Sequence, residues 1–326
     1  MTEPEIVKYI KEISMKFTKK RDQITDYVLD HRQVSAYASF YLPTNMPKMH
    51  FLLSRLPGSV LDDLKNRPFI DMGAGPGTFS LAYKMLMKIP GHVEMTAVDS
   101  AQIMLDQATK IMNGFFPGDK FQTMRKYQTA QPNGILFFGH SINEMGIDRA
   151  QDQIMTIDPE YVMWIEPGTS EFFHDIKKLR SQLLESYDVI YPCPGNAGCP
   201  SDWCHQVLRT SHDPGVERLS QMVSLDRKIL PMVAHVYKRK KKTATVVNNG
   251  PVTIRFMNET KFSFEYEVCM QNEKNENRNV VIEIQKKQLS KSEEKAFKNA
   301  DVGEKISFEV EKIVQEKLRV KLVRED

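Results

Sequence analysis

The chain has 326 residues, of which 41% are hydrophobic and 27% are charged, and its formal net charge is +3. This balance excludes an intrinsically disordered chain and supplies enough apolar material for one large domain or two modest ones. No apolar run approaches the ~20 residues of a membrane span, so we expect no transmembrane helix. The acidic start MTEPEIVKYIKEI lacks the apolar core of a secretory signal, so we expect an intracellular protein.

Residues 1–65 predict an N-terminal helical region that caps the next domain. Apolar side chains recur there at the helical period, at Ile6, Ile10, Ile13 and Phe17. Pro43 and Pro47 interrupt the pattern, and interior prolines break or kink helices. The region is therefore expected to form several short helices at angles to one another.

From residue 66 to about 237, strand-like and helix-like segments alternate. In chain order they are RPFIDMGAG (strand, then glycine turn), TFSLAYKMLMKI (helix), HVEMTAVDS (strand), SAQIMLDQATKIMNGF (helix), FQTMRKYQ, GILFFGHS and YVMWIEPG (strands), SEFFHDIKKLRSQLLES (helix) and DVIYPCP (strand). This alternation predicts a doubly wound α/β fold, in which ligands bind at the carboxyl ends of the parallel strands. Ser170 is expected to cap the last helix.

A glycine-rich turn comes after the first strand. FIDMGAGPGTFSLA contains Asp71, Gly73, Gly75 and Gly77, and the next strand ends at Asp99. Glycines let the backbone turn sharply close to a ligand, and a carboxylate at the second strand end can accept hydrogen bonds from ribose hydroxyls. The G-x-G-x-G spacing and the acid before it differ from a dinucleotide site. They predict S-adenosylmethionine, whose amino group suits Asp71.

The fourth strand leads into GHSINEMG, where the acceptor of a methyl group is often held. His140, Asn143 and Glu144 are polar and available there, but Asn143 and Glu144 can equally cap the next helix. No acid occurs in residues 121–131, where adenine is often bound. The sequence therefore assigns no catalytic residue, and it leaves open whether the pocket turns over its cofactor.

Three of the four cysteines lie within PCPGNAGCPSDWCH, inside a loop expected at 192–205. These are Cys193, Cys199 and Cys204, and the fourth cysteine is Cys269. Thiolates select zinc or iron–sulfur clusters, and proline and glycine favour a tight loop that turns sulfurs inward. The fourth ligand is either Cys269 or His205. We favour Cys269 and a 4Fe–4S cluster, with zinc as the alternative.

A basic run, KRKKK at 238–242, precedes a β-rich region at 243–326. The strands expected there are TATVV, VTIRF, FSFEYEVCM, NVVIEIQ, KISFEVEKIV and LRVKLV. Several short alternating strands predict a small OB-like β-domain. The basic run, with Lys286 and Lys287, can contact nucleic-acid phosphates, or the run can be a solvated linker.

Five of these segments together resemble the mitochondrial small-ribosomal-subunit methyltransferase-like family, which has bacterial members. The segments are SAYASFYLPTNMPKM, DMGAGPGT, HSINEMG, IEPGTSEFFHDIKKLR and PCPGNAGCPSDWCH. The resemblance implies a class I methyltransferase fold and association with the small ribosomal subunit and its rRNA during assembly or translation. It is compatible both with methyl transfer and with a factor that has lost this activity. It also implies cofactor contacts at Asp71, Gly73, Gly75, Gly77 and Asp99, and a 4Fe–4S cluster held by Cys193, Cys199, Cys204 and Cys269.

The expected protein is thus a monomer in a bacterial cytoplasm, or in the mitochondrial matrix if the source is eukaryotic. It acts as a methyltransferase-like factor of the small subunit, and its cluster has a structural role. The alternative is an active rRNA methyltransferase that modifies a small-subunit base.

Overall fold

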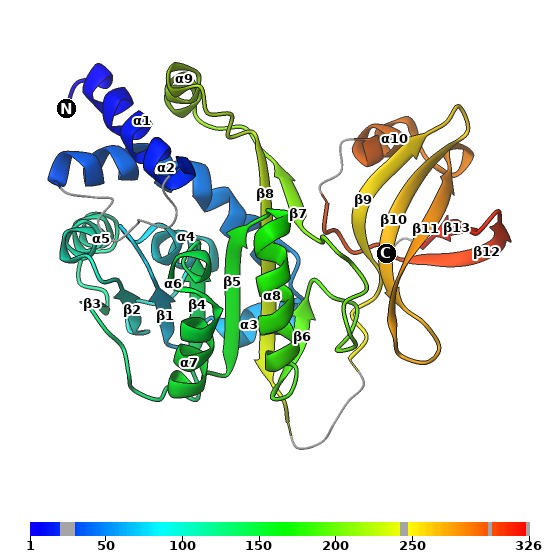
Figure 1. Cartoon of the computed structure of the whole chain (residues 1–326), viewed down its shortest axis with the longest axis horizontal. Coiled ribbons are helices and arrows are strands. Elements are labelled where there is room, and N and C mark those ends of the chain that lie inside the picture. Colours follow the sequence, from blue (N-terminus) through cyan, green and yellow to red (C-terminus); the bar gives the residue numbers. More distant parts are fainter. Residues whose placement is uncertain (20–29, 242–246, 299–301, 324–326) are drawn as a thin grey trace. The chain divides into compact units, whose positions relative to one another are not determined.

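The computed structural model describes residues 1–19, 30–241, 247–298 and 302–323. The chain forms two compact units, one of residues 1–167 and 209–230, the other of residues 168–208 and 231–326. They are called unit 1 and unit 2 (Figure 1). No described helix has the length and apolarity that crossing a membrane requires.

Unit 1 contains most of the helices and a parallel sheet. Its helices are α1 (Glu3–Lys19), α2 (His31–Ser54), α3 (Gly58–Leu64), α4 (Thr78–Met87), α5 (Gln102–Phe115), α6 (Ile142–Met145), α7 (Ile147–Ile157) and α9 (Pro214–Val223). Its strands are β1 (Phe69–Met72), β2 (Met95–Val98), β3 (Phe121–Met124), β4 (Ile135–Gly139) and β5 (Tyr161–Pro167). The strands lie in the order β3-β2-β1-β4-β5, and every neighbouring pair is parallel.

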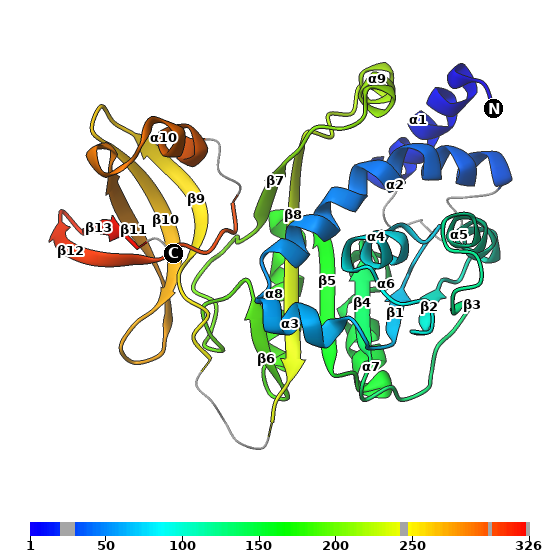
Figure 2. The ribbon, with the colours of Figure 1, turned by 180° about the vertical axis from the view of Figure 1, so that it is seen from behind.

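This sheet confirms the predicted α/β fold. In the register, Met72 at the end of β1 lies opposite Val98 on β2 and Phe138 on β4, so three strand ends meet at one edge. Helices α2 and α4 cover one face of the sheet and α7 covers the other (Figures 1 and 2). Strands β1 and β2 are wholly buried, which is typical of a parallel sheet covered on both faces.

The prediction of several short helices before residue 65 is wrong for α2, which is one helix of 24 residues through Pro43 and Pro47. Each proline removes one backbone hydrogen bond. Burial compensates for this loss, because Phe40 on one side of the prolines and Phe51 on the other are almost completely buried. Helix α2 also packs against α1 and α9 around a shared apolar cluster that includes Phe40.

Unit 2 begins with α8 (Ser170–Leu183) and β6 (Tyr187–Tyr191), and it contains most of β7 (Gln206–Arg209) and of β8 (Ile229–Arg239). Thr169 caps α8, not the predicted Ser170, because its side chain can accept a hydrogen bond from the first turn. Strand β8 pairs with β6 antiparallel and also with β7. The sequence patterns did not reveal β7, α9 or β8.

The remainder of unit 2 is a five-stranded sheet. It consists of β9 (Val252–Glu259), β10 (Ser263–Gln271), β11 (Asn277–Gln285), β12 (Phe308–Val314) and β13 (Lys317–Leu322), with a short 3-10 helix η2 (Lys286–Gln288) and α10 (Lys291–Lys298) between β11 and β12. The order is β12-β13-β11-β10-β9, with β11 and β13 parallel. The helix α10 after the third strand of the sheet, β11, and the parallel pairing of β11 with the fifth strand, β13, are features of an OB-like sheet. This agrees with the prediction. The strand expected at 243–247 lies almost wholly outside the described residues.

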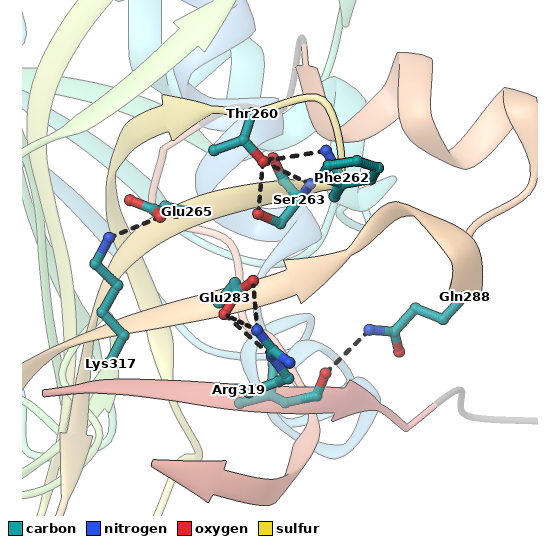
Figure 3. Close-up of polar contacts among 9 residues, drawn as sticks. Thr260, Phe262, Ser263, Glu265, Glu283, Gln288, Lys317 and Arg319 are labelled. Atoms are coloured by element: carbon teal, nitrogen blue, oxygen red, sulfur yellow. Dashed lines mark hydrogen bonds and ion pairs between the residues drawn. The ribbon is translucent and has the colours of Figure 1, made fainter. Parts of the chain in front are cut away.

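Ion pairs join the strands of this sheet (Figure 3). Arg319 on β13 forms a forked contact with the Glu283 carboxylate on β11, and Lys317 pairs with Glu265 on β10 at 2.7 Å. Beneath them, Val268, Ile282 and Val320 are fully buried. The sheet therefore has its own apolar core as well as cross-strand charge pairs.

Candidate functional site

Backbone hydrogen bonds connect the glycine turn of unit 1 to the neighbouring strand β2. The backbone N–H groups of Gly73 and Ala74 both donate to the Val98 carbonyl, at 2.8 and 2.9 Å. Gly73, Gly75 and Gly77 all have positive φ, at +72°, +54° and +79°, a region that other residues rarely adopt. A Cβ at Gly75 would meet no atom within 4 Å. The backbone there borders open space, as a ligand cradle requires.

Asp99 lies against this turn, as the strand spacing predicts. Its Oδ2 accepts from the Gly75 N–H and its Oδ1 from the Ala101 N–H, both at 2.9 Å. Burial raises the pKa of Asp99, and these two hydrogen bonds act in the opposite direction. Each carboxylate oxygen has a second lone pair, so a fixed Asp99 can still accept two further hydrogen bonds from a diol.

A cavity of about 320 Å³ lies at the same strand ends. It is lined by Met72, Val98, Arg125, Lys126, Tyr127, Gln128, Met145, Arg149, Asp152 and Gln153. Met72 and Val98 directly precede Gly73 and Asp99. Residues 121–131 contain no acid, but Asp152 on α7 brings a carboxylate to the cavity from a separate part of the chain.

Asp71 has a different environment from the one that a cofactor contact predicts. Its side chain is 0% exposed, and its Oδ2 accepts from both the Ser80 N–H and the Ser80 hydroxyl, at 3.0 and 2.7 Å. Its Oδ1 is buried, with no hydrogen-bond partner among the described residues. Burial raises the pKa of Asp71 to about 7. The contact of Asp71 with a cofactor amino group stays a prediction.

The segment after β4 is organised by a residue that the sequence patterns did not single out. Glu166, at the end of β5, is fully buried and accepts hydrogen bonds from the backbone N–H groups of Ser141, Ile142 and Asn143. It thereby caps α6, the role considered for Asn143 and Glu144. Burial raises the pKa of Glu166 to about 8.

A partly buried pair of basic residues lies beside the glycine turn. Lys48 on α2, 4% exposed, has its Nζ 2.8 Å from His140 Nε2. His140 immediately precedes Ser141, whose hydroxyl donates to the Met72 carbonyl at the start of the turn. Burial, followed by the charge of Arg227, lowers the pKa of Lys48. Burial, followed by the charge of Lys48, lowers the pKa of His140 well below 6.5. His140 is therefore neutral near pH 7.

In unit 2, helix α8 and the OB-like sheet both contact the cysteine loop. The Arg180 side chain donates to Cys193 Sγ at 3.3 Å and to the carbonyls of Gly195 and Ala197 at 3.2 and 2.8 Å. Asn277 on β11 donates to the same two carbonyls, at 3.1 and 3.0 Å. Side chains of two different elements, α8 and β11, thus hold the loop by hydrogen bonds.

All four cysteines are free thiols in this unit. The pKa of Cys204 is raised by burial and then by the charges of Cys193, Cys199 and Cys269. Burial, followed by the charges of Cys193 and Cys199, raises the pKa of Cys269 to about 12. The charge of Cys269 on β10 thus acts on Cys204, and the charges of the loop residues Cys193 and Cys199 act on Cys269. Within the described part of the chain, however, no three His, Cys, Asp or Glu side chains have the arrangement of a formed metal site.

His205, the alternative fourth ligand, is placed differently. Its ring stacks on Trp203, with the ring centroids 4.3 Å apart, and its Nδ1 is buried without a partner in the described parts of the chain. Burial lowers the pKa of His205, so the ring is neutral and can bind a metal. The choice between His205 and Cys269 stays a prediction.

The family model described as mitochondrial small ribosomal subunit Rsm22 matches residues 31–304. No curated protein matches the sequence. Among solved structures, the chain is similar to PH1948 of Pyrococcus horikoshii, which is described as a candidate RNA methyltransferase. The two sequences are 12% identical and the TM-score is 0.40. The match covers 61% of this chain and 83% of PH1948. It is also similar to magnesium protoporphyrin IX methyltransferase of Synechocystis PCC 6803, with 10% identity, a TM-score of 0.39, and coverage of 73% and 97%.

Proposed function

Since the chain belongs to the Rsm22 family, we propose that it is an S-adenosylmethionine-binding, methyltransferase-like factor of the small ribosomal subunit, acting in subunit assembly or translation. The family match over residues 31–304 supports the small ribosomal subunit as the partner. The cofactor proposal rests on one observation, the hydrogen bond from Gly75 to Asp99 beside the cavity at the strand ends. The protein would act as a monomer, in the matrix of a eukaryotic mitochondrion or in a bacterial cytoplasm.

The cofactor's parts have suitable partners in unit 1. Asp99 would accept the ribose hydroxyls, and the cavity lined by Tyr127, Gln128 and Asp152 would hold the adenine. Cavities of about 300 Å³ or more suit ligands of this size. The open space at Gly75 would hold the middle of the cofactor.

Equilibrium dialysis with labelled S-adenosylmethionine tests the cofactor proposal. Asp99→Asn keeps the shape of the side chain but converts one acceptor into a donor, so it should weaken binding at least about ten-fold, or ~1.4 kcal/mol. Asp106→Asn is the matched control, because Asp106 is an exposed carboxylate on α5 bonded to Gln102. Equal affinity of wild type and Asp99→Asn would contradict the site.

The alternative, an active rRNA methyltransferase, is favoured by one observation, the Lys48–His140 pair beside the turn. A neutral imidazole can accept the proton that a base amino group loses on methylation. The test incubates labelled cofactor with small-subunit particles that lack the modification. Transfer that is lost in His140→Ala supports an enzyme. Cofactor binding and particle binding without transfer support the non-catalytic factor.

We also propose that the four cysteines hold a structural 4Fe–4S cluster, with zinc as the alternative. The donor set fits such a centre, since it consists of four free thiols in one unit, and the charges of neighbouring cysteines raise the pKa values of Cys204 and Cys269. Loading would require the sulfurs to draw closer, because the described residues contain no formed metal site. When bound, the cluster would tie the loop to β10 covalently, and binding free energy at such sites adds to folding free energy.

Elemental analysis and a visible spectrum of anaerobically purified protein test the metal proposal. Iron, sulfide and absorbance near 400 nm are expected in the wild type. Cys199→Ser should lose all three together with soluble yield. Zinc without iron would select the alternative, and a stable wild type without any metal would reject both.

RNA contact is proposed for exposed parts of unit 2. The basic run is partly folded, because Lys238 and Arg239 belong to β8 and the Lys240 ammonium donates to the Leu184 carbonyl, while Lys242 lies outside the described residues. Lys286 is paired with Glu259 at 2.7 Å and is a poorer candidate. Lys240→Glu should weaken co-sedimentation with small subunits and reduce its salt dependence. Unchanged co-sedimentation would remove the run from the interface.

The β9–β10 turn is a second candidate for RNA contact (Figure 3). Phe262 is 71% exposed, and the Lys261 ammonium lies 5.5 Å from its ring centre. Thr260 Oγ1 accepts from the N–H groups of Phe262 and Ser263, so hydrogen bonds within the turn stabilise its conformation. An exposed ring beside a cation can stack on an unpaired base.

A further inference from the structure

Arg180 is a buried guanidinium that forms no ion pair with any acidic side chain in the described parts of the chain. The side chain is 2% exposed and projects from α8 toward the cysteine loop. Its hydrogen bonds among the described residues go to one sulfur and two backbone carbonyls, at 2.8–3.3 Å. Its positive charge is thus surrounded by acceptors that are not carboxylates.

Neutral acceptors do not cancel a buried positive charge. Burying an ion without a counter-charge is strongly unfavourable, and an arginine cannot release its proton to escape the cost. His235 and Tyr237, hydrogen-bonded to each other at 2.7 Å, are nearby. Burial and the charge of Arg180 lower the pKa of His235 to about 3, so this ring adds no charge. The groups around Arg180 that can become negative are chiefly the cysteine sulfurs.

We propose that Arg180 is the fixed counter-charge and the positioning residue of the four-thiol site, and that it adapts this site to an anionic, four-thiolate metal centre. This inference rests on the metal proposal above. A 4Fe–4S core with four thiolates carries net negative charge, and Arg180 supplies a positive charge in contact with one of those sulfurs.

The geometry gives Arg180 two separable tasks. Its Nη2 group donates to the Gly195 and Ala197 carbonyls, which also accept hydrogen bonds from Asn277 on β11. Its Nε group contacts Cys193 Sγ. A lysine at this position could restore the positive charge. It could not restore all three hydrogen bonds, because a single ammonium cannot reproduce the planar, multidentate geometry of a guanidinium. The two tasks can therefore be tested with different substitutions.

The experiment compares Arg180→Lys and Arg180→Met with the wild type in full-length, anaerobically purified protein. The matched control is Lys177→Met. Lys177 lies on the same helix and donates to the Ser201 carbonyl at 2.9 Å, contacting the loop without touching a sulfur. The readouts are metal content, metal release to a chelator, and the midpoint potential of the loaded fraction.

Arg180→Met should weaken metal retention by about 10–100-fold, as is typical when a group that supports the ligands is lost. Its midpoint potential should shift to more negative values, because the positive charge favours the reduced, more negative centre. Arg180→Lys should retain metal better than Arg180→Met and have a potential nearer the wild type. Lys177→Met should match the wild type in all three readouts. If the metal is zinc, the order of release to the chelator takes the place of the potential.

Three results would overturn the assignment. The first is unchanged retention and potential in Arg180→Met. The second is equal loss in both Arg180 variants with unchanged potentials, which would indicate packing alone. The third is an effect of Lys177→Met as large as that of Arg180→Met. A wild type without metal would instead reject the metal proposal itself, and this inference with it.

Discussion

Substituting alanine at two neighbouring glycines should separate folding from ligand binding. Gly73 and Gly75 both have positive φ, but their surroundings differ. A Cβ at Gly73 would lie 2.3 Å from the Ser141 Cβ and 3.6 Å from the Ser141 Cα, whereas a Cβ at Gly75 would meet nothing within 4 Å. Ser141 cannot easily move away, because its hydroxyl is bonded to the Met72 carbonyl at 2.6 Å.

The free energies follow from these contacts. The left-handed conformation costs an alanine about 1–2 kcal/mol, and overpacking at a tight site costs about 1–3 kcal/mol more. Gly73→Ala should therefore lower the free energy of unfolding by about 2–5 kcal/mol, and Gly75→Ala by about 1–2 kcal/mol. If the cofactor occupies the open space, Gly75→Ala should still weaken binding at least about ten-fold, or ~1.4 kcal/mol.

Urea unfolding of both variants gives the stability change, and equilibrium dialysis with labelled S-adenosylmethionine gives the affinity. The reasoning about steric contact is wrong if Gly75→Ala is destabilised as strongly as Gly73→Ala. The cofactor placement is wrong if Gly75→Ala binds as tightly as the wild type.

Three further changes test other parts of the molecule. The pKa of Asp71 is raised to about 7 in the folded chain from an ordinary value of 3.8, so its contribution to stability is complete below pH ~4 and is lost as the pH rises toward 7. Asp71→Asn should flatten this dependence in unfolding curves measured from pH ~4 to ~8, and an unchanged slope would contradict the raised pKa. Ile282→Ala in the core of the OB-like sheet, at a side chain 0% exposed, should cost about 2–5 kcal/mol in urea unfolding, and a loss below ~1 kcal/mol would show that the site collapses without a cavity. Phe262→Ala should leave stability unchanged, because the ring is exposed, but weaken binding of single-stranded RNA by about 1–3 kcal/mol. Equal RNA affinity in a filter-binding assay would exclude this turn from the RNA contact.

Local patterns predicted the parts of the fold that depend on a few consecutive residues. Buried strands such as Phe69–Met72, the glycine turn after them and the alternating strands of the OB-like sheet all follow from periodicity or from the conformational freedom of glycine. The continuous helix α2 could not be predicted in this way, because Pro43 and Pro47 oppose it locally and the burial of Phe40 and Phe51 favours it only in the folded chain.

The sequence by itself determined which residue types are available: a glycine turn with Asp99 one strand later, and four thiols without a fifth cysteine. Only the tertiary structure decided their partners. Lys48 meets His140 across 92 positions of sequence, Asp152 reaches the cavity from α7, and Arg180 contacts the cysteine loop. Backbone conformation is set largely by neighbouring residues, so it can be inferred locally. Side-chain contacts between distant segments arise only when whole elements pack, and no short pattern encodes them.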